Sequence, residues 1–362
     1  MRVHRTATLS LLPYLLPHTA LIVMLIICVT RSFGALRSLV CLWFLLTVID
    51  AFLRMPQWTA NKQTDHAEST EDSSWTAILL LAFVLHMALL FAALDTVSTR
   101  GISFQNFLLI TTTVGIARGM FAISAAHEMM HRTSRLERIA AQATMQSFGY
   151  LHFRIEHLYD HHVHVGTHHD PATARLGESF YTFYLRSIPN GLVNAWRIQE
   201  RRLERARLPI CSVRNELLVG LAIQCLVLVI IGWSFGPIGI GFFLLQGLLG
   251  QSNVELINYI QHYGLQRRMT ASGRPESIKP IHSWDSNHCL GNWFLFNLPR
   301  HSDHHCNPWK PVHILRSRNN APQLPMGYLA MFWLALCPPL WRRVMNPKVE
   351  SLRRGKSPFT EA

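Results

Sequence analysis

The stretch SFQNFLLITTTVGIARGMFAISAAHEMMH, residues 103–131, does most to decide the fold of this chain. Up to Ala126 it is long and apolar enough for a helix that crosses a membrane, which needs about 20 residues. Its end is different, because His127 and His131 lie four residues apart and leave the same face of a helix. A membrane helix that ends in two imidazoles predicts a ligand site at the membrane boundary.

The composition of the whole chain agrees with a membrane protein. Of 362 residues, 49% are hydrophobic and 15% are charged, whereas soluble domains carry about 25% charged residues. The mean hydropathy is +0.16. Backbone groups in hydrocarbon must bond one another, so long apolar stretches form helices. Six stretches predict spanning helices: Ala7–Val29, Ala35–Leu53, Trp75–Val97, Ser103–Ala126, Glu216–Trp233 and Pro237–Ile260.

Basic residues predict which side of the membrane each connection occupies. Of 34 Lys and Arg, 12 lie in residues 127–214 and 14 in residues 259–362, and the positive-inside rule places both segments in the cytoplasm. We therefore expect an all-α integral membrane protein with six transmembrane helices and cytoplasmic termini. The expected regions are 1–126 with four spans, a cytoplasmic insertion 127–214, a hairpin 215–262 and a cytoplasmic region 263–362.

Three smaller features bound the possibilities further. The apolar stretch Met326–Trp341 is short and contains two prolines, so it is interpreted as a docked or interfacial helix, with a short true span as the alternative. The seven cysteines are scattered and none forms Cys-x-x-Cys, which argues against a zinc ribbon, a fused rubredoxin domain or a disulfide framework. The net charge of +13 favours anionic headgroups and an acidic partner protein.

Histidines are concentrated at the predicted cytoplasmic ends of these helices. Sixteen of the 20 histidines lie between His127 and His313. Nine of them form four motifs, which is too many imidazoles for one metal ion and about right for two. Imidazole suits iron, zinc, copper and nickel alike, so ligand type alone leaves the metal open. The nine are His127, His131, His157, His161, His162, His262, His301, His304 and His305.

The spacing within the motifs suggests how one helix can serve two ions. His157 and His161 are four residues apart, and His162 is rotated by about 100° from its neighbour in an α-helix. The same spacing of three and four recurs at His301, His304 and His305. His262 ends the sixth predicted span on one face with Glu255 and Asn258, and polar groups inside a span usually face the protein interior.

Other readings of single motifs remain open at this stage. HEMMH at 127–131 matches the His-Glu-x-x-His pattern of zinc proteases, with Glu128 as the general base. A catalytic zinc takes three protein ligands, which leaves most of the other histidines unexplained. Each histidine cluster alone could also be a surface patch, and a membrane metal carrier is the reading that involves no catalysis.

Seven longer motifs give the chain a resemblance to a known family. The chain resembles the membrane-bound alkane monooxygenases of the AlkB type, within the fatty-acid desaturase and hydroxylase superfamily, over roughly residues 35–349. His-x3-His-His in the second motif and His-Tyr-Gly in the fourth separate this group from ordinary desaturases. The motifs are HEMMHR (127–132), EHLYDHH (156–162), DPATARLGES (170–179), NYIQHYGL (258–265), HSWDSN (282–287), LPRHSDHHCNP (298–308) and PPLWRRVMNP (338–347).

The resemblance implies a fold and a reaction. It implies one desaturase-like domain at about residues 100–330, two non-haem Fe ions held by the nine histidines, and a cytoplasmic active site. The implied reaction is hydroxylation of the terminal methyl group of an alkane or alkyl chain, with O2 as co-substrate. Two electrons come from a separate rubredoxin- or ferredoxin-type donor and its reductase, and the apolar substrate comes from the bilayer. No nucleic acid is involved.

The resemblance also suggests supporting residues and alternatives. Asp170, Glu178, His282 and Asp303 are candidates to orient the imidazoles by hydrogen bonds. His168, His169, Ile155 and Gln261 depart from the family pattern, and His168 and His169 are expected to face solvent. Related activities are hydroxylation of alkyl-aromatic methyl groups and desaturation or hydroxylation of fatty acyl chains. The host membrane is a bacterial inner membrane or a eukaryotic endomembrane.

Overall fold

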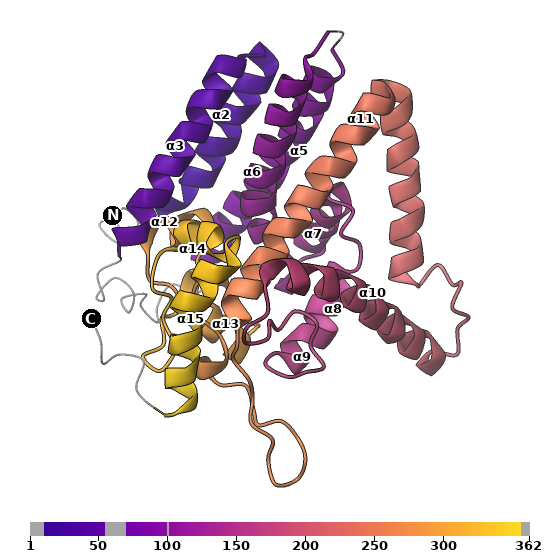
Figure 1. The fold of residues 1–362 in the computed structure, drawn as a ribbon. Coiled ribbons are helices and arrows are strands. Elements are labelled where there is room, and N and C mark those ends of the chain that lie inside the picture. The colour runs from indigo at the N-terminus through magenta and orange to yellow at the C-terminus, as the bar shows by residue number, and fades with distance from the viewer. Residues whose placement is uncertain (1–10, 55–69, 100, 356–362) are drawn as a thin grey trace.

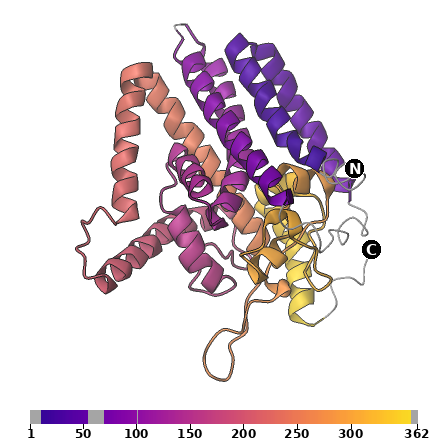
Figure 2. The same ribbon diagram turned by 180° about the vertical axis from the view of Figure 1, so that it is seen from behind.

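The computed structural model describes residues 11–54, 70–99 and 101–355, and within these ranges the regular elements are helices (Figure 1). Long helices stand side by side in one half of the molecule, and shorter ones gather at their lower ends (Figures 1 and 2). Five helices are long and apolar enough to cross a membrane. The all-helical prediction is confirmed, and the protein is an integral membrane protein. The five are α2 (Leu16–Thr30, preceded by η1, Leu12–Leu15), α3 (Phe33–Phe52), α5 (Thr70–Val97), α6 (Phe104–His131) and α11 (Glu216–His262).

The remaining elements form the end of the molecule that carries the histidine motifs. They come from the two segments that connect or follow the long helices, and α10 runs crosswise to the long helices (Figure 1). Their bounds are α7 (Arg135–Ser147), α8 (Phe153–Glu156), η2 (His157–His161), α9 (His162–His164), α10 (Phe180–Arg205), η3 (Pro280–His282), α12 (Cys289–Phe294), α13 (His301–Cys306), η4 (Val312–Ile314), α14 (Tyr328–Ala335) and α15 (Pro338–Arg353).

The 47-residue element α11 changes direction in its middle. Gly236 has φ 69° and ψ −171°, a conformation that an L side chain rarely adopts. Pro237 follows and has no N–H to bond the preceding turn. The two arms of α11 form a hairpin whose open end faces the short helices (Figures 1 and 2). The predicted boundary between residues 233 and 237 falls at this break.

Helix α6 carries a buried arginine in the middle of an apolar segment. Arg118 donates to the backbone oxygen of His86 at 3.2 Å and to the hydroxyl of Ser147 at 2.9 Å, and it also bonds the Gln246 amide oxygen. Its guanidinium lies 4.7 Å from the ring centroid of Phe148. Because burying an unpaired charge is costly, these contacts explain how α6 can hold an arginine and still cross the bilayer.

Two glycines bring α6 and α11 into close contact above the histidines. A Cβ atom added to Gly119 would lie 2.7 Å from the Cα of Gly250, so α6 cannot come this close to α11 with a larger residue at position 119. The contact fixes the lower ends of both helices relative to each other. Those ends carry His127 and His131 on α6 and His262 on α11.

The C-terminal helices hold the short elements against the long ones. The predicted docked helix at 326–341 is two helices, α14 and α15, that meet just before Pro338. On the membrane side, the Trp333 ring stacks on Phe44 of α3 at 4.9 Å. Asp50 of α3 accepts the N–H groups of Gly291 and Leu329 at 3.0 and 3.2 Å. The C-terminal region is thereby tied to the membrane helices.

Candidate metal centre

The first motif occupies the last turn of α6. His127 and His131 are one turn apart, as predicted, and their ring centroids are 5.2 Å apart. His127 is buried and His131 is half-buried. Between them, Glu128 accepts a hydrogen bond from Nε of Arg132 at 2.7 Å and from the N–H of Val312 at 3.3 Å. Its carboxylate is therefore engaged in structural contacts.

The second motif contains a π-helical turn that changes which histidines share a face. In η2 the N–H of His162 bonds the carbonyl of His157, five residues earlier. The wider turn places His157 and His162 on one side, with their Nε2 atoms 3.0 Å apart. His161 points to a different set of rings. The expected pairing of His157 with His161 at four-residue spacing is therefore not what the structure shows.

The histidines of the LPRHSDHHCNP motif (298–308) and His262 complete the arrangement. On α13, His301 and His305 are one turn apart and their Nε2 atoms lie 2.9 Å from each other. Nε2 of His262, at the end of α11, is 3.1 Å from Nε2 of His301. His304 is rotated away and lies 3.2 Å from Nε2 of His162. One short helix thus offers imidazoles in two directions.

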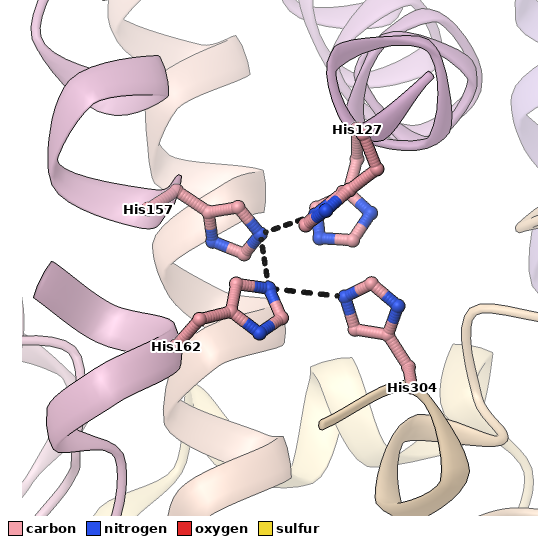
Figure 3. Close-up of side chains that lie close together, drawn as sticks. His127, His157, His162 and His304 are labelled. Carbon is pink, nitrogen blue, oxygen red and sulfur yellow. Dashed lines mark hydrogen bonds between the residues drawn. The ribbon is translucent and has the colours of Figure 1, made fainter. Parts of the chain in front are cut away.

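All nine predicted histidines gather in two adjacent groups. In each group, one ring nitrogen from every member lies within 4.8 Å of the others. Figure 3 shows the rings of His127, His157, His162 and His304 turned towards one another. The five-histidine group is His127, His131, His157, His162 and His304; the four-histidine group is His161, His262, His301 and His305.

The nitrogen positions fit a metal ion in each group. Two nitrogens bound to one ion at about 2.1 Å lie about 3.0–3.4 Å apart at bond angles of about 90–109°. Neighbouring Nε2 atoms here are 2.9–3.2 Å apart. Nε2 of His157 faces two such atoms, and so does Nε2 of His301. A single proton on each Nε2 cannot serve both of its neighbours. Nε2 of His161 is buried and has no hydrogen-bond partner within the described part of the chain.

Burial favours the neutral imidazoles that a metal requires. It lowers the pKa of His157, His301, His304 and His305 well below the usual value, and the neighbouring imidazoles lower the pKa further. Neutral rings keep a lone pair on the nitrogen that faces the group. Both groups are therefore prepared to bind a cation at neutral pH.

Of the four predicted supporting residues, Asp170 contacts a ring of the centre. It lies 2.9 Å from Nδ1 of His161, which leaves Nε2 of that ring to face the four-histidine group. Burial alone would raise the pKa of Asp170, but the His161 ring and the Thr173 hydroxyl outweigh this and hold the pKa below its usual value. A carboxylate behind a ligating imidazole orients the ring and increases its basicity.

The side chains of the other three supporting candidates bind other groups, although the backbone of His282 lies within hydrogen-bonding reach of the His262 ring. Glu178 pairs with Arg186 at 2.8 Å, and His282 accepts the N–H of Lys279 at 3.0 Å. Asp303 accepts the N–H of Arg316 and pairs with Arg318. These contacts shape the loops around the motifs. His168 and His169 are exposed, as expected, and belong to neither histidine group.

One residue that the sequence did not single out anchors the helix α13, which carries His301, His304 and His305. Asp285 is fully buried and accepts the N–H and the hydroxyl of Ser302, both at 2.7 Å, so it anchors α13 beside His301. Burial raises the pKa of Asp285 to about 7. Its place in the HSWDSN motif, next to His282, was the available signal, but nothing in the spacing separates an anchor from a loop residue.

An apolar cavity and a smaller one approach the histidines along α6. The larger cavity, of about 480 Å³, is lined by α2, α3 and α6 and by the rings of Trp43, Phe121 and Phe294. The smaller cavity, of about 20 Å³, touches His127 of the five-histidine group and His301 of the four-histidine group. Both cavities are therefore lined by α6, the larger by Phe121 and the smaller by His127, six residues further along the helix.

This fold and this site define an integral membrane protein with two adjacent histidine groups that could each hold a metal ion. Residues 102–335 match the family model described as fatty acid desaturase. The chain belongs to the fatty acid desaturase family, and within it to the group of AlkB-type alkane 1-monooxygenases.

Individual relatives support this assignment. The chain is 42% identical over 244 residues to alkane 1-monooxygenase 2 of Pseudomonas aeruginosa, covering 67% of this chain and 65% of that protein. It is 36% identical over 321 residues to alkane 1-monooxygenase of Acinetobacter baylyi, covering 88% and 78%. The xylene/toluene monooxygenase hydroxylase component XylM of Pseudomonas putida is 26% identical over 233 residues, covering 64% and 61%. The chain spans 64–65% of the length of three of the alkane 1-monooxygenases.

Proposed function

We propose that the protein hydroxylates the terminal methyl group of alkanes or related alkyl chains. The observation that carries this proposal is the placement of nine imidazoles in two adjacent buried groups below an apolar cavity. The names of the related alkane 1-monooxygenases point to the same reaction. The overall stoichiometry is RH + O2 + 2 e⁻ + 2 H⁺ giving ROH + H2O.

In this proposal each histidine group holds one non-haem iron ion. The five-histidine and four-histidine groups serve as the two ligand sets, and Asp170 orients His161. Bound iron supplies the activation of O2 and the insertion of one oxygen atom into a C–H bond. The protein supplies ligand geometry and a site from which bulk water is excluded.

The proposed membrane arrangement follows the break in α11. If each arm of α11 crosses the bilayer, the chain has six spans and the histidines lie on the same side as residues 127–214 and 263–362. The basic residues of those segments then lie in the cytoplasm, with both termini. The host membrane is a bacterial inner membrane or a eukaryotic endomembrane.

The apolar cavity is the proposed place for the alkyl chain. Its wall is formed by membrane helices, so a substrate dissolved in the bilayer reaches it without crossing water. Trp43, Phe121 and Phe294 pack against one another with ring centroids 5.3–6.0 Å apart. In this proposal the alkyl chain lies against these rings, and its end is presented first to the histidines.

The two electrons come, in this proposal, from a separate rubredoxin- or ferredoxin-type protein and its reductase. The cysteines of the described residues are free, so they form no iron–sulfur motif or disulfide that could carry electrons. The net charge of +13 favours an acidic carrier.

A second candidate activity is hydroxylation of a methyl group on an aromatic ring. The relative named as a xylene/toluene monooxygenase component favours it. A fatty acyl chain is the third substrate class that the family suggests. Protease chemistry at His127 and His131 is disfavoured, because Glu128 bonds Arg132 and Val312 instead of facing the groups.

The deciding experiment measures metal content and products on the same preparation. Purified full-length protein should contain about two irons per chain. With a bacterial rubredoxin, its reductase and NADH, it should convert octane to 1-octanol faster than it converts a xylene or a fatty acid. One zinc per chain and no octanol would reject the proposal, and a faster reaction of the xylene would favour the second candidate.

A further inference from the structure

The small cavity between the two histidine groups carries polar side chains that an alkane cannot use. It is lined by His127, His301, Ser124, Asn258 and Gln261, together with apolar groups. At about 20 Å³ it has room for one small group, because a water molecule needs about 10–15 Å³ measured in this way. It therefore suits the end of a ligand rather than its whole length.

Gln261 offers this cavity an unused hydrogen-bond donor. The residue is 1% exposed, and its Nε2 has no hydrogen-bond partner within the described part of the chain. The phenol of Tyr328 is fully buried and lies within hydrogen-bonding reach of this amide, although the two groups form no hydrogen bond of good geometry in the described part of the chain. A buried polar group without a partner costs about 1–3 kcal/mol. Of these two groups, Gln261 lines the cavity, so an oxygen atom placed in the cavity can accept its hydrogen bond.

Asn258 provides the complementary acceptor. Its Nδ2 donates to Glu255 at 3.1 Å, which orients the amide, and an amide oxygen can accept a hydrogen bond from a hydroxyl group. Gln261 lies three residues further along α11, so both side chains leave neighbouring faces of the helix towards the cavity. A hydroxyl group needs one donor and one acceptor, and these two amides supply both.

We propose that the cavity binds the hydroxyl group of a primary alcohol, with Gln261 as the donor to its oxygen. This inference rests on the proposed function, because the alcohol is then the product of the reaction and its alkyl chain occupies the larger cavity. The hydroxyl group replaces the methyl group after oxygen insertion. The protein therefore holds the alcohol more tightly than the alkane, and release of the alcohol from Gln261 is a distinct step.

The test compares binding of 1-octanol and octane without turnover. Full-length, iron-loaded protein in detergent is kept free of oxygen and reductant, and unlabelled octane or 1-octanol competes with radiolabelled 1-octanol in equilibrium dialysis. Gln261→Met preserves the length of the side chain and removes both amide groups. We expect the preference for 1-octanol over octane to fall about tenfold, the effect of losing about one buried hydrogen bond.

Two further variants make the result specific. Gln251→Met is the matched control on the same helix, since the Gln251 amide donates to the carbonyl of Phe148 at 2.8 Å and does not line the cavity. It should leave the preference unchanged. Tyr328→Phe should lower the preference by a smaller factor, and it tests the same site if Gln261→Met fails to fold or loses iron.

The outcomes separate this inference from the proposed function. An unchanged preference in iron-replete Gln261→Met would overturn the alcohol site, and so would a wild-type protein that binds octane as tightly as 1-octanol. Octane hydroxylation by the wild type is measured separately with rubredoxin. A failure there, with alcohol binding intact, would reject the reaction and leave Gln261 as a binding residue.

Discussion

The two histidine groups differ in their access to solvent and in their support. The five-histidine group includes the half-buried His131 and His162, whereas all four members of the other group are buried. Asp170 lies behind His161 in the four-histidine group. Two sites built from the same residue type are therefore unequal, and an ion in each should differ in tightness of binding and in rate of exchange.

The largest expected effect comes from removing a ligand of the buried group. His262→Ala leaves the four-histidine group with three ligands, so we expect iron to fall from about two to about one per chain. Octane hydroxylation should fall at least about 100-fold, because the proposed activation of O2 requires both ions. Elemental analysis and gas chromatography measure the two quantities. His169→Ala, at an exposed histidine, should change neither; a His262→Ala protein with full iron would show that this ring is not a ligand.

A smaller effect is expected from the residue that supports the same group. Asp170→Asn keeps the shape but removes the charge behind His161, and losses of this kind weaken metal binding about 10–100-fold. Titration with a competing chelator should show that one ion of the pair becomes weaker. Asp160→Asn is the control, because Asp160 bonds His164 and Asn194, which belong to neither group. Equal weakening of both ions would contradict the assignment of Asp170 to one group.

The sequence predicted the membrane helices and the nine histidines but not how the histidines divide. Apolar composition extends over whole helices, so the predicted ends of the second, third and fourth spans lie within a few residues of the observed ones, although α6 continues through His131. The predicted start of the first span at Ala7 lies outside the described residues. Spacing of four residues correctly paired His301 with His305. It failed at His157, because a π-helical turn aligns residues five apart and no local sequence pattern marks such a turn.

The partners of buried groups were equally hidden from the sequence. Arg118 made the fourth predicted span look weak, and its acceptors come from three distant segments that include Gln246 and Ser147. Asp303 was expected to orient an imidazole and instead binds Arg316 and Arg318. These contacts depend on which loops the fold brings together, and periodicity within one helix carries no information about them.

Lowering the pH should destabilise the folded protein, because both histidine groups contain buried neutral imidazoles. Unfolded histidines take up protons below about pH 6.5, whereas buried His157, His301, His304 and His305 resist protonation because their pKa values are lowered. Protons therefore bind the unfolded chain more strongly, and folding stability falls as pH decreases below about 6.5. The melting temperature of iron-free protein should drop by several degrees between about pH 7 and pH 5. His301→Asn should flatten the profile, and an unchanged slope would show that these rings do not control it.

The smallest expected effect is a difference between the two groups in the rate of iron release. An external chelator meets the half-buried His131 and His162 first, while the four-histidine group is reached only through a local opening of the structure. Iron release followed by absorbance of a ferrous chelate should therefore be biphasic, with phases of equal amplitude that differ in rate about tenfold or less. Asp170→Asn should accelerate the slow phase alone, because it loosens the ring that closes the buried group. A single phase in the wild type, or acceleration of the fast phase in the variant, would show that accessibility does not distinguish the two groups.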